Sequence, residues 1–199
     1  MLLALGADRT AALRSPGGVA RKSELQSVSA DPATDQFLRQ FRPLRESTTQ
    51  RHALATEVVA AATRNRLDPD RLLALVAVES GFDRTAVSRK GARGLGQVMF
   101  PTAQAVAPTL VHRPKDLYDV RRNLAITASH LRWLLIAAGG DLMGALTMYH
   151  AGPHNRRLPK PGEDRYVGLI CTYYASLKVR RHYGEMVAMT AGTTARPED

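Results

Sequence analysis

Cysteine, acidic side chains and long apolar runs are all scarce in this 199-residue chain. Its one cysteine, Cys171, excludes an internal disulfide and a cysteine-rich zinc site. No apolar run is long enough to cross a bilayer as a helix, so we expect no integral membrane segment. Aspartate and glutamate number 18 against 28 lysines and arginines, and this net charge of +10 indicates an anionic partner.

The overall composition is otherwise that of an ordinary globular protein. Hydrophobic residues make up 44% of the chain and charged residues 23%, so extensive disorder is not expected. The length suits one compact domain with tails. No alternating pattern typical of strands stands out, and no internal repeat does, so the sequence predicts an all-α fold.

The two ends of the chain differ from the middle. Residues 1–47 contain a stretch rich in serine, glycine, proline and alanine, and we predict a flexible region that serves as a docking or export segment. Its opening, MLLALGADRT, lacks the basic start and the apolar stretch of roughly 7–15 residues of a secretory signal, so the export route stays open. Residues 186–199 are predicted to be a disordered tail.

Helical periodicity begins at Thr48, and residues 48–185 are predicted to form the single folded domain. Asp68 and Pro69 form a helix start, and Gly81 is a stop, around a segment that is apolar on nearly every side. Three later helices are expected over residues 120–138, 141–149 and 164–183, the last ending at Gly184, and a glycine-rich loop is expected over residues 84–101.

Glu79 is a charged residue at the end of that apolar helix. It follows Leu72, Leu75 and Val76 at helical spacing, so its carboxyl shares the buried face. Burial disfavours the charged form and raises the pKa of a carboxyl, as does a helix C-terminus. A carboxyl that is protonated near neutral pH can act as a general acid. From position alone, a capping role, a pair with arginine or exposure to solvent remain alternatives.

Three segments around this glutamate resemble one enzyme family. The stretch ESGFDRTAVSRKGARGLGQVMFPTA, from Glu79 to Ala103, resembles the catalytic signature of the lytic transglycosylases of the soluble (SLT, goose-lysozyme-like) family. The segment ALTMYHAGP, from Ala145 to Pro153, resembles the family's tyrosine box, and Arg165-Tyr166-Val167 resembles its third motif. The resemblance covers residues 68–183 and implies a lysozyme-like fold.

The resemblance also implies an activity. The family cleaves the β-1,4 bond between N-acetylmuramic acid and N-acetylglucosamine in peptidoglycan and forms a 1,6-anhydro sugar without water. Glu79 would be its single acid/base, because the substrate supplies the internal nucleophile. No cofactor is implied. The expected partner is the peptidoglycan glycan strand, in the bacterial periplasm or cell wall, with secretion, conjugation or phage machinery as candidate partners.

The loop after Glu79 supplies three candidate binding residues. By resemblance, Ser88 would hydrogen-bond the substrate N-acetyl group or Glu79 itself. Gln97 would donate to the substrate from the cleft wall, and Met99 would pack against a sugar. The loop departs from the family at Gly96, where methionine is the commonest residue.

The other candidate binding residues come from the last two helices. By resemblance, Tyr149 would lie beside Glu79 and orient it, and Tyr166 would line the far wall of the cleft. His150 replaces the family's usual asparagine, and imidazole can reproduce only one of the amide's hydrogen bonds. His150 and His154 are four residues apart, but Gly152-Pro153 prevents a shared helical face, so no metal site is predicted.

Three other functions are alternatives to the transglycosylase. A hydrolytic muramidase usually needs a second carboxylate, and Asp83 is the only acid near Glu79 in the sequence. A non-enzymatic wall-binding protein of a secretion apparatus would not need an intact Glu79. Nucleic-acid binding is not predicted, because the sequence has no zinc-finger spacing, no basic region with heptads and no aromatic RNA-binding motif.

The basic charge falls in two clusters that we expect to flank the cleft. One follows Glu79 and consists of Arg84, Arg89, Lys90 and Arg93, and the other consists of Arg156, Arg157 and Lys160. Their expected targets are the carboxylates of peptidoglycan stem peptides. The alternative is that both clusters are solvated loop charges.

Overall fold

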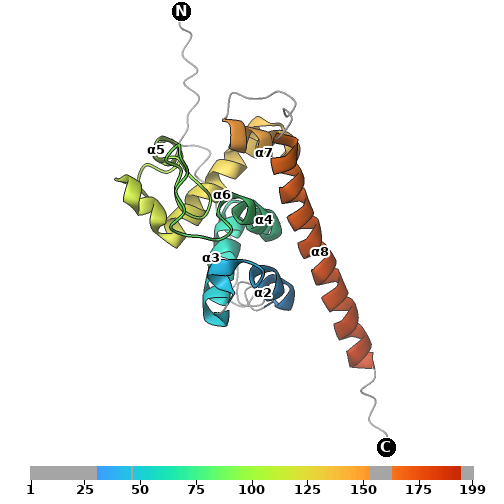
Figure 1. Cartoon of the computed structure of the whole chain (residues 1–199). Helices are drawn as coiled ribbons and strands as arrows, with labels where there is room; N and C mark the ends of the chain where they lie inside the picture. Colours follow the sequence, from blue (N-terminus) through green and yellow to red (C-terminus); the bar gives the residue numbers. More distant parts are fainter. Residues whose placement is uncertain (1–30, 46, 153–162, 194–199) are drawn as a thin grey trace, which may run out of the picture.

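The computed structural model describes residues 31–45, 47–152 and 163–193, and in the last range the side chains of residues 165–186. Over these residues the protein forms seven α-helices and two short 3-10 helices, with two isolated β-bridges and no strand (Figure 1). The all-α fold class is thereby confirmed. No helix in the described part of the chain is long and apolar enough to span a membrane.

The helices follow one another in the order in which the sequence predicts most of them. They are α2 (Pro32–Leu38), η2 (Arg42–Leu44), α3 (Thr48–Arg64), α4 (Pro69–Ser80), α5 (Phe100–Val106), η3 (Pro114–Tyr118), α6 (Val120–Ala137), α7 (Leu142–Ala151) and α8 (Glu163–Thr193). The predicted boundaries of α4 are confirmed. Asp68 caps it by accepting a hydrogen bond from the Asp70 amide, and Gly81 ends it in the left-handed conformation at φ +56°.

Helix α4 lies at the centre of the molecule, between α3 and α8 (Figure 1). Its middle turns are buried almost completely, with Leu72, Leu73, Leu75 and Val76 at 0–1% exposure. The prediction of a buried helix from its all-round apolar sequence is therefore confirmed. This burial fixes the helix that carries Glu79.

The folded domain begins before the predicted boundary. Residues 31–45 were expected to belong to a flexible region, yet α2 and η2 pack against the core and Phe37 and Leu38 are fully buried. The Phe37 ring makes edge contacts with Phe41, Phe82 and Tyr173. Aromatic burial of this kind outweighs the weak helix propensity of a short segment. Residues 1–30 lie outside the described residues.

The last helix extends beyond its predicted end. Gly184 was expected to stop α8 and residues 186–199 to form a loose tail, but the helix runs to Thr193. A glycine inside a helix costs only about 1 kcal/mol and stops it only where the chain turns into a left-handed conformation. Helix α5 was also missed, because the glycine-rich loop was expected to run to Pro101 and no helix was expected after it, whereas Pro101 fits the first turn of α5.

Ion pairs join α8 to the N-terminal ends of α4 and α2. The Arg181 guanidinium lies 2.6 Å from a carboxylate oxygen of Asp70 and 2.6 Å from one of Asp31. One turn earlier, the Lys178 ammonium lies 2.9 Å from Asp68. The side chains of Asp70 and Arg181 are largely buried, so these contacts resist screening by salt. They hold α8 along the side of α4.

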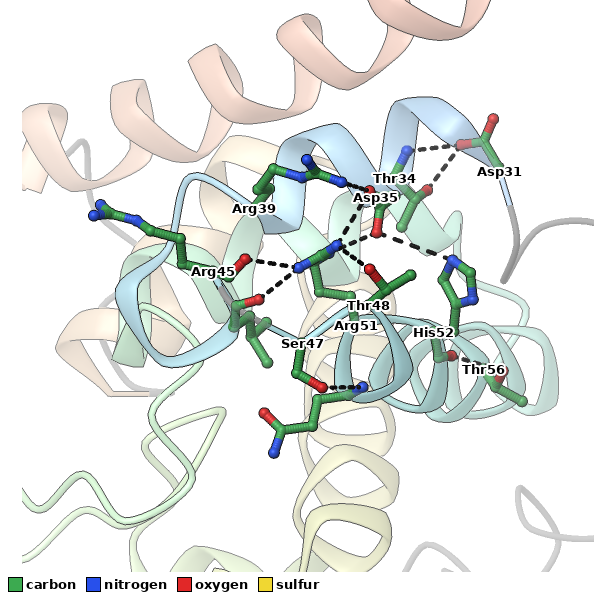
Figure 2. Close-up of polar contacts among 12 residues, drawn as sticks. Asp31, Thr34, Asp35, Arg39, Arg45, Ser47, Thr48, Arg51, His52 and Thr56 are labelled. Atoms are coloured by element: carbon green, nitrogen blue, oxygen red, sulfur yellow. Dashed lines mark hydrogen bonds and ion pairs between the residues drawn. The ribbon is translucent and has the colours of Figure 1, made fainter.

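Arg51 of α3 fastens the N-terminal segment in a similar way (Figure 2). Its side chain is only 2% exposed, and its Nε donates to Asp35 of α2 at 2.5 Å. Its Nη1 donates to the carbonyl oxygens of Leu44 and Arg45, each at 2.9 Å. Because the charge and its donors all find partners, the buried arginine links α2 and η2 to α3.

Replacement of Arg51 tests this link. We expect Arg51→Ala to lower the free energy of unfolding by about 3 kcal/mol, since it leaves the carbonyl groups of Leu44 and Arg45 without their side-chain donor and Asp35 without its buried partner. The matched control is Arg39→Ala, which removes the exposed partner of the same aspartate and should cost under about 1 kcal/mol. Urea denaturation measures both values, and equal losses in the two variants would contradict the role assigned to Arg51.

Candidate active site

Glu79 lies in the last turn of α4, where its carboxyl is largely withdrawn from solvent. Its Oε1 accepts a hydrogen bond from the Tyr166 hydroxyl of α8. Burial raises the pKa of Glu79 to about 7, and the Tyr166 hydrogen bond works in the opposite direction because it favours the charged form. Such a carboxyl can both give up and take back a proton near neutral pH.

Tyr149 of α7 lies close enough to Glu79 for the charge of that carboxyl to act on its hydroxyl. Its hydroxyl donates to the Gly96 carbonyl oxygen at 2.8 Å. Burial, together with the charge of Glu79, raises the pKa of Tyr149 well above its usual range, so the phenol stays protonated. The family resemblance implied that Tyr149 would orient Glu79, but the hydroxyl that binds Glu79 in the structure belongs to Tyr166.

His150 is exposed to solvent and contacts the Tyr166 side chain. Its ring stacks on the Tyr166 ring, with the centroids 4.2 Å apart and the planes 28° from parallel. The histidine side chain therefore covers the tyrosine that binds Glu79. The structure brings together Glu79, Tyr149, His150 and Tyr166, from three helices.

The three candidates on the loop have different surroundings. The Ser88 hydroxyl oxygen accepts a hydrogen bond from the Ala92 amide at 3.0 Å, within a turn. The Gln97 side-chain amide donates to the carbonyl oxygens of Gly94 and Ala86, so its donors hold the loop together. Met99 is 37% exposed and its side chain is accessible. No hydrogen bond joins Ser88 to Glu79 among the described side chains.

Asn123 of α6 anchors this loop, and the sequence analysis did not single it out. Its side chain is completely buried, and its Oδ1 accepts from the Gly96 amide at 2.8 Å. Its Nδ2 donates to the carbonyl oxygens of Arg93 and Leu117, at 2.9 and 2.8 Å. A buried amide with three partners fixes the loop backbone. The feature of the sequence that could have identified Asn123 is its position, one turn before Thr127 on a largely apolar helix face.

Close packing of the loop against α6 explains why residue 96 is a glycine. A Cβ atom at this position would lie 1.9 Å from the Thr127 hydroxyl oxygen and 2.7 Å from its methyl carbon. Any side chain therefore collides with the helix unless the loop moves. The departure from the family's usual methionine at this position thus has a local steric cause, which is the pairing of Gly96 with Thr127.

Among the described side chains, no hydrogen bond or ion pair joins the other acidic and basic residues near the loop to Glu79, and they have surroundings of their own. The Asp83 carboxylate accepts hydrogen bonds from the amide and the hydroxyl of Thr85, and these contacts lower its pKa. Arg84, Arg89 and Lys90 are exposed. The second basic cluster, Arg156 to Lys160, lies outside the described residues, as does His154. No cluster of three or more potential metal ligands occurs in the described part of the chain.

Comparison with known proteins agrees with this geometry. The model of the transglycosylase SLT domain matches residues 57–163, which is more than half of the chain. The chain therefore belongs to the transglycosylase SLT domain family.

Two solved structures share the fold. One is an inactive glutamate-to-glutamine mutant of the lytic transglycosylase Slt from Pseudomonas aeruginosa, at 19% identity and a TM-score of 0.59, over 73% of this chain and 28% of that one. The other is the 70 kDa soluble lytic transglycosylase from Escherichia coli, at 18% identity and a TM-score of 0.61, over 84% of this chain and 31% of that one. This chain thus spans less than a third of the length of either protein.

Substitution of Gly96 tests the packing of the loop on α6. We expect Gly96→Ala to lower the free energy of unfolding by about 1–3 kcal/mol, because the added methyl group overlaps Thr127. The control is Gly168→Ala in α8, where the added methyl group meets nothing within 4 Å and should be neutral or stabilising. Thermal or urea unfolding measures the difference, and a fully stable Gly96→Ala protein would show that the loop is not held against the helix.

Proposed function

We propose that this protein is a peptidoglycan lytic transglycosylase that cleaves the bond from N-acetylmuramic acid to N-acetylglucosamine and forms 1,6-anhydro-N-acetylmuramic acid. The observation that carries the proposal is the Glu79 carboxyl, buried at the end of α4 with a pKa of about 7 and bound by Tyr166. The family of the chain supports the same activity.

In the proposed reaction one carboxyl group acts twice. Protonated Glu79 gives its proton to the glycosidic oxygen, the C1–O bond breaks, and its electron pair leaves with the N-acetylglucosamine. The carbonyl oxygen of the muramic N-acetyl group then bonds to C1. The Glu79 carboxylate then takes the proton of the 6-hydroxyl, O6 displaces the acetyl oxygen at C1, and the anhydro ring closes. Atoms balance without water, and Glu79 ends protonated as it began.

The surroundings of Asp83 favour this route over hydrolysis. A hydrolytic muramidase would use a second carboxylate to position water or to attack C1. The nearest acid in sequence is Asp83, whose carboxylate is engaged by Thr85 in its own turn. The intact and buried Glu79 also disfavours a wall-binding protein without activity, because a buried carboxyl without a function only lowers stability.

The substrate-binding roles proposed for the neighbouring side chains follow their positions. Met99 offers an accessible apolar surface to a sugar. The Ser88 hydroxyl oxygen accepts from the Ala92 amide, so the hydroxyl group can still donate a hydrogen bond to a substrate acetyl group. Gln97 acts by shaping the loop, because its donors are used there. Tyr166 orients the Glu79 carboxyl, and His150 covers that tyrosine.

The proposed place of action follows from the substrate. Peptidoglycan lies outside the bacterial cytoplasm, so we propose the periplasm or the cell wall as the location. A protein that opens local gaps in the wall would serve secretion, conjugation or phage machinery. The exposed Arg84, Arg89 and Lys90 would face the carboxylates of the stem peptides, which agrees with the net charge of +10.

Glu79→Gln tests the catalytic assignment. We expect wall-clearing activity to fall by about 10²-fold or more, because the amide can neither donate nor accept the transferred proton. Glu57→Gln is the matched control, because Glu57 lies on α3, pairs at the surface with Arg121 of α6, and its replacement should leave activity unchanged. Turbidity of purified wall material measures both. Unchanged clearing by folded Glu79→Gln protein would reject the proposed acid/base.

Digestion in ¹⁸O-labelled water distinguishes the two reactions. The proposed reaction takes up no water, so mass spectrometry should find anhydro-muramic ends without the heavy isotope. A hydrolase would give reducing ends that carry one labelled oxygen. Labelled reducing ends as the main product would establish the muramidase alternative instead.

A further inference from the structure

The closest ring contact in the described part of the chain joins His150 of α7 to Tyr166 of α8. The two ring centroids are 4.2 Å apart, whereas the other ring contacts there have centroid separations of 4.8–6.3 Å. His150 is exposed to solvent and does not belong to the hydrophobic core, while Tyr166 packs against that core. The main consequence of the stack is therefore the position of the Tyr166 ring.

Both rings are carried by helical turns that the core holds in place. Met148, two residues before His150, is 1% exposed, and Val167, next to Tyr166, is fully buried. These two neighbours belong to the same hydrophobic cluster, in which α7 packs against α8. Core packing therefore brings the two rings together, and the stack is a fixed feature of the fold.

The stacked tyrosine is the residue whose hydroxyl binds the Glu79 carboxyl. This hydroxyl lies at the far end of the side chain, so a small rotation about the Cα–Cβ bond moves it away from the carboxyl. Aromatic stacking favours the ring position in which the contact is made. Among the described side chains, no hydrogen bond or ion pair joins His150 to Glu79 itself, so an effect of His150 on the carboxyl would pass through Tyr166.

We propose that His150 is a positioning residue for the general acid, whose ring holds the Tyr166 ring so that the hydroxyl stays directed at the Glu79 carboxyl. This inference rests on the proposed function and gives His150 a role that needs no contact with the substrate. It also gives a use for histidine at a position where the family's usual residue is asparagine, because an amide has no aromatic face to stack on a phenol.

A positive charge on His150 is the other way in which this residue could act on the carboxyl. Burial, and then the charge of the carboxyl, raises the pKa of Tyr149 and of Tyr166, so both phenols are neutral. On α6, burial lowers the pKa of His130 to about 4, so this ring is neutral as well. Arg165, beside Tyr166 on α8, is exposed. His150→Phe separates stacking from charge, because it keeps a ring and removes the nitrogens that titrate.

Titration of the Glu79 carboxyl in the ¹³C-labelled full chain reports on the Tyr166 hydroxyl. The hydrogen bond from Tyr166 lowers the pKa of Glu79, so a weaker bond raises the midpoint. We expect Tyr166→Phe to raise it by about one pH unit and His150→Ala by about half a unit. His150→Asn should behave like His150→Ala, and His150→Phe should keep the midpoint of the parent protein.

A double variant and a matched control complete the experiment. His150→Ala combined with Tyr166→Phe should have the midpoint of Tyr166→Phe alone, because without the hydroxyl the stack has nothing to direct. The control is His182→Ala, since His182 is an exposed histidine of the same helix. It lies sixteen residues after Tyr166, about 24 Å along α8, and its loss should leave the midpoint unchanged. Amide spectra identify the variants that are folded.

Two results would overturn the positioning role and leave the proposed function standing. One is an unchanged Glu79 midpoint in folded His150→Ala protein, and the other is a shift in His150→Phe as large as that in His150→Ala. Additive shifts in the double variant would also overturn it, because His150 would then act independently of the Tyr166 hydroxyl.

The pH dependence of kcat/KM tests the proposed function separately. If Glu79 is the general acid, the basic limb of this profile should move together with the carboxyl midpoint in His150→Ala and Tyr166→Phe. A carboxyl midpoint that moves as expected while the basic limb stays in place would support the positioning role and contradict the acid/base role of Glu79.

Discussion

The partial burial of the Glu79 carboxyl is the constraint on which the rest of the site depends. Burial favours the protonated form and the Tyr166 hydroxyl favours the charged form, and the pKa of about 7 is the balance of the two. Because this pKa lies above the ordinary value of 4.5, the folded state holds the proton more tightly than the unfolded chain does. Stability from Glu79 is thus complete below about pH 4.5 and is lost, by up to about 3 kcal/mol, as pH rises through 7.

The fold offsets this loss of stability by fixing both partners of the hydrogen bond between Tyr166 and Glu79. Glu79 ends a helix whose middle is fully buried, and Tyr166 belongs to α8, which is fastened to the start of α4 through Arg181 and Asp70. The loop that closes the site is held from a third direction by Asn123. Each element of the site is therefore positioned by contacts made outside it, which is how a pre-organised site keeps its geometry.

Local signals in the sequence predicted α4 and the raised pKa of the Glu79 carboxyl, because helix caps, apolar periodicity and burial act within a few residues of each other. They could not predict which tyrosine binds Glu79, since Tyr149 and Tyr166 lie on different helices whose packing decides the contact. The ends of the domain were mispredicted for a related reason. The segment 31–45 folds through long-range contacts of Phe37, and α8 passes Gly184 because nothing there turns the chain.

Direct titration of the Glu79 carboxyl tests the central claim. In ¹³C-labelled protein, the side-chain carboxyl resonance that disappears in Glu79→Gln can be followed by nuclear magnetic resonance as pH is varied. The account predicts a midpoint at about pH 7, well above that of the exposed glutamates. A midpoint near 4.5 would show that the carboxyl is charged at neutral pH, and the proposed general acid would then have no proton to give.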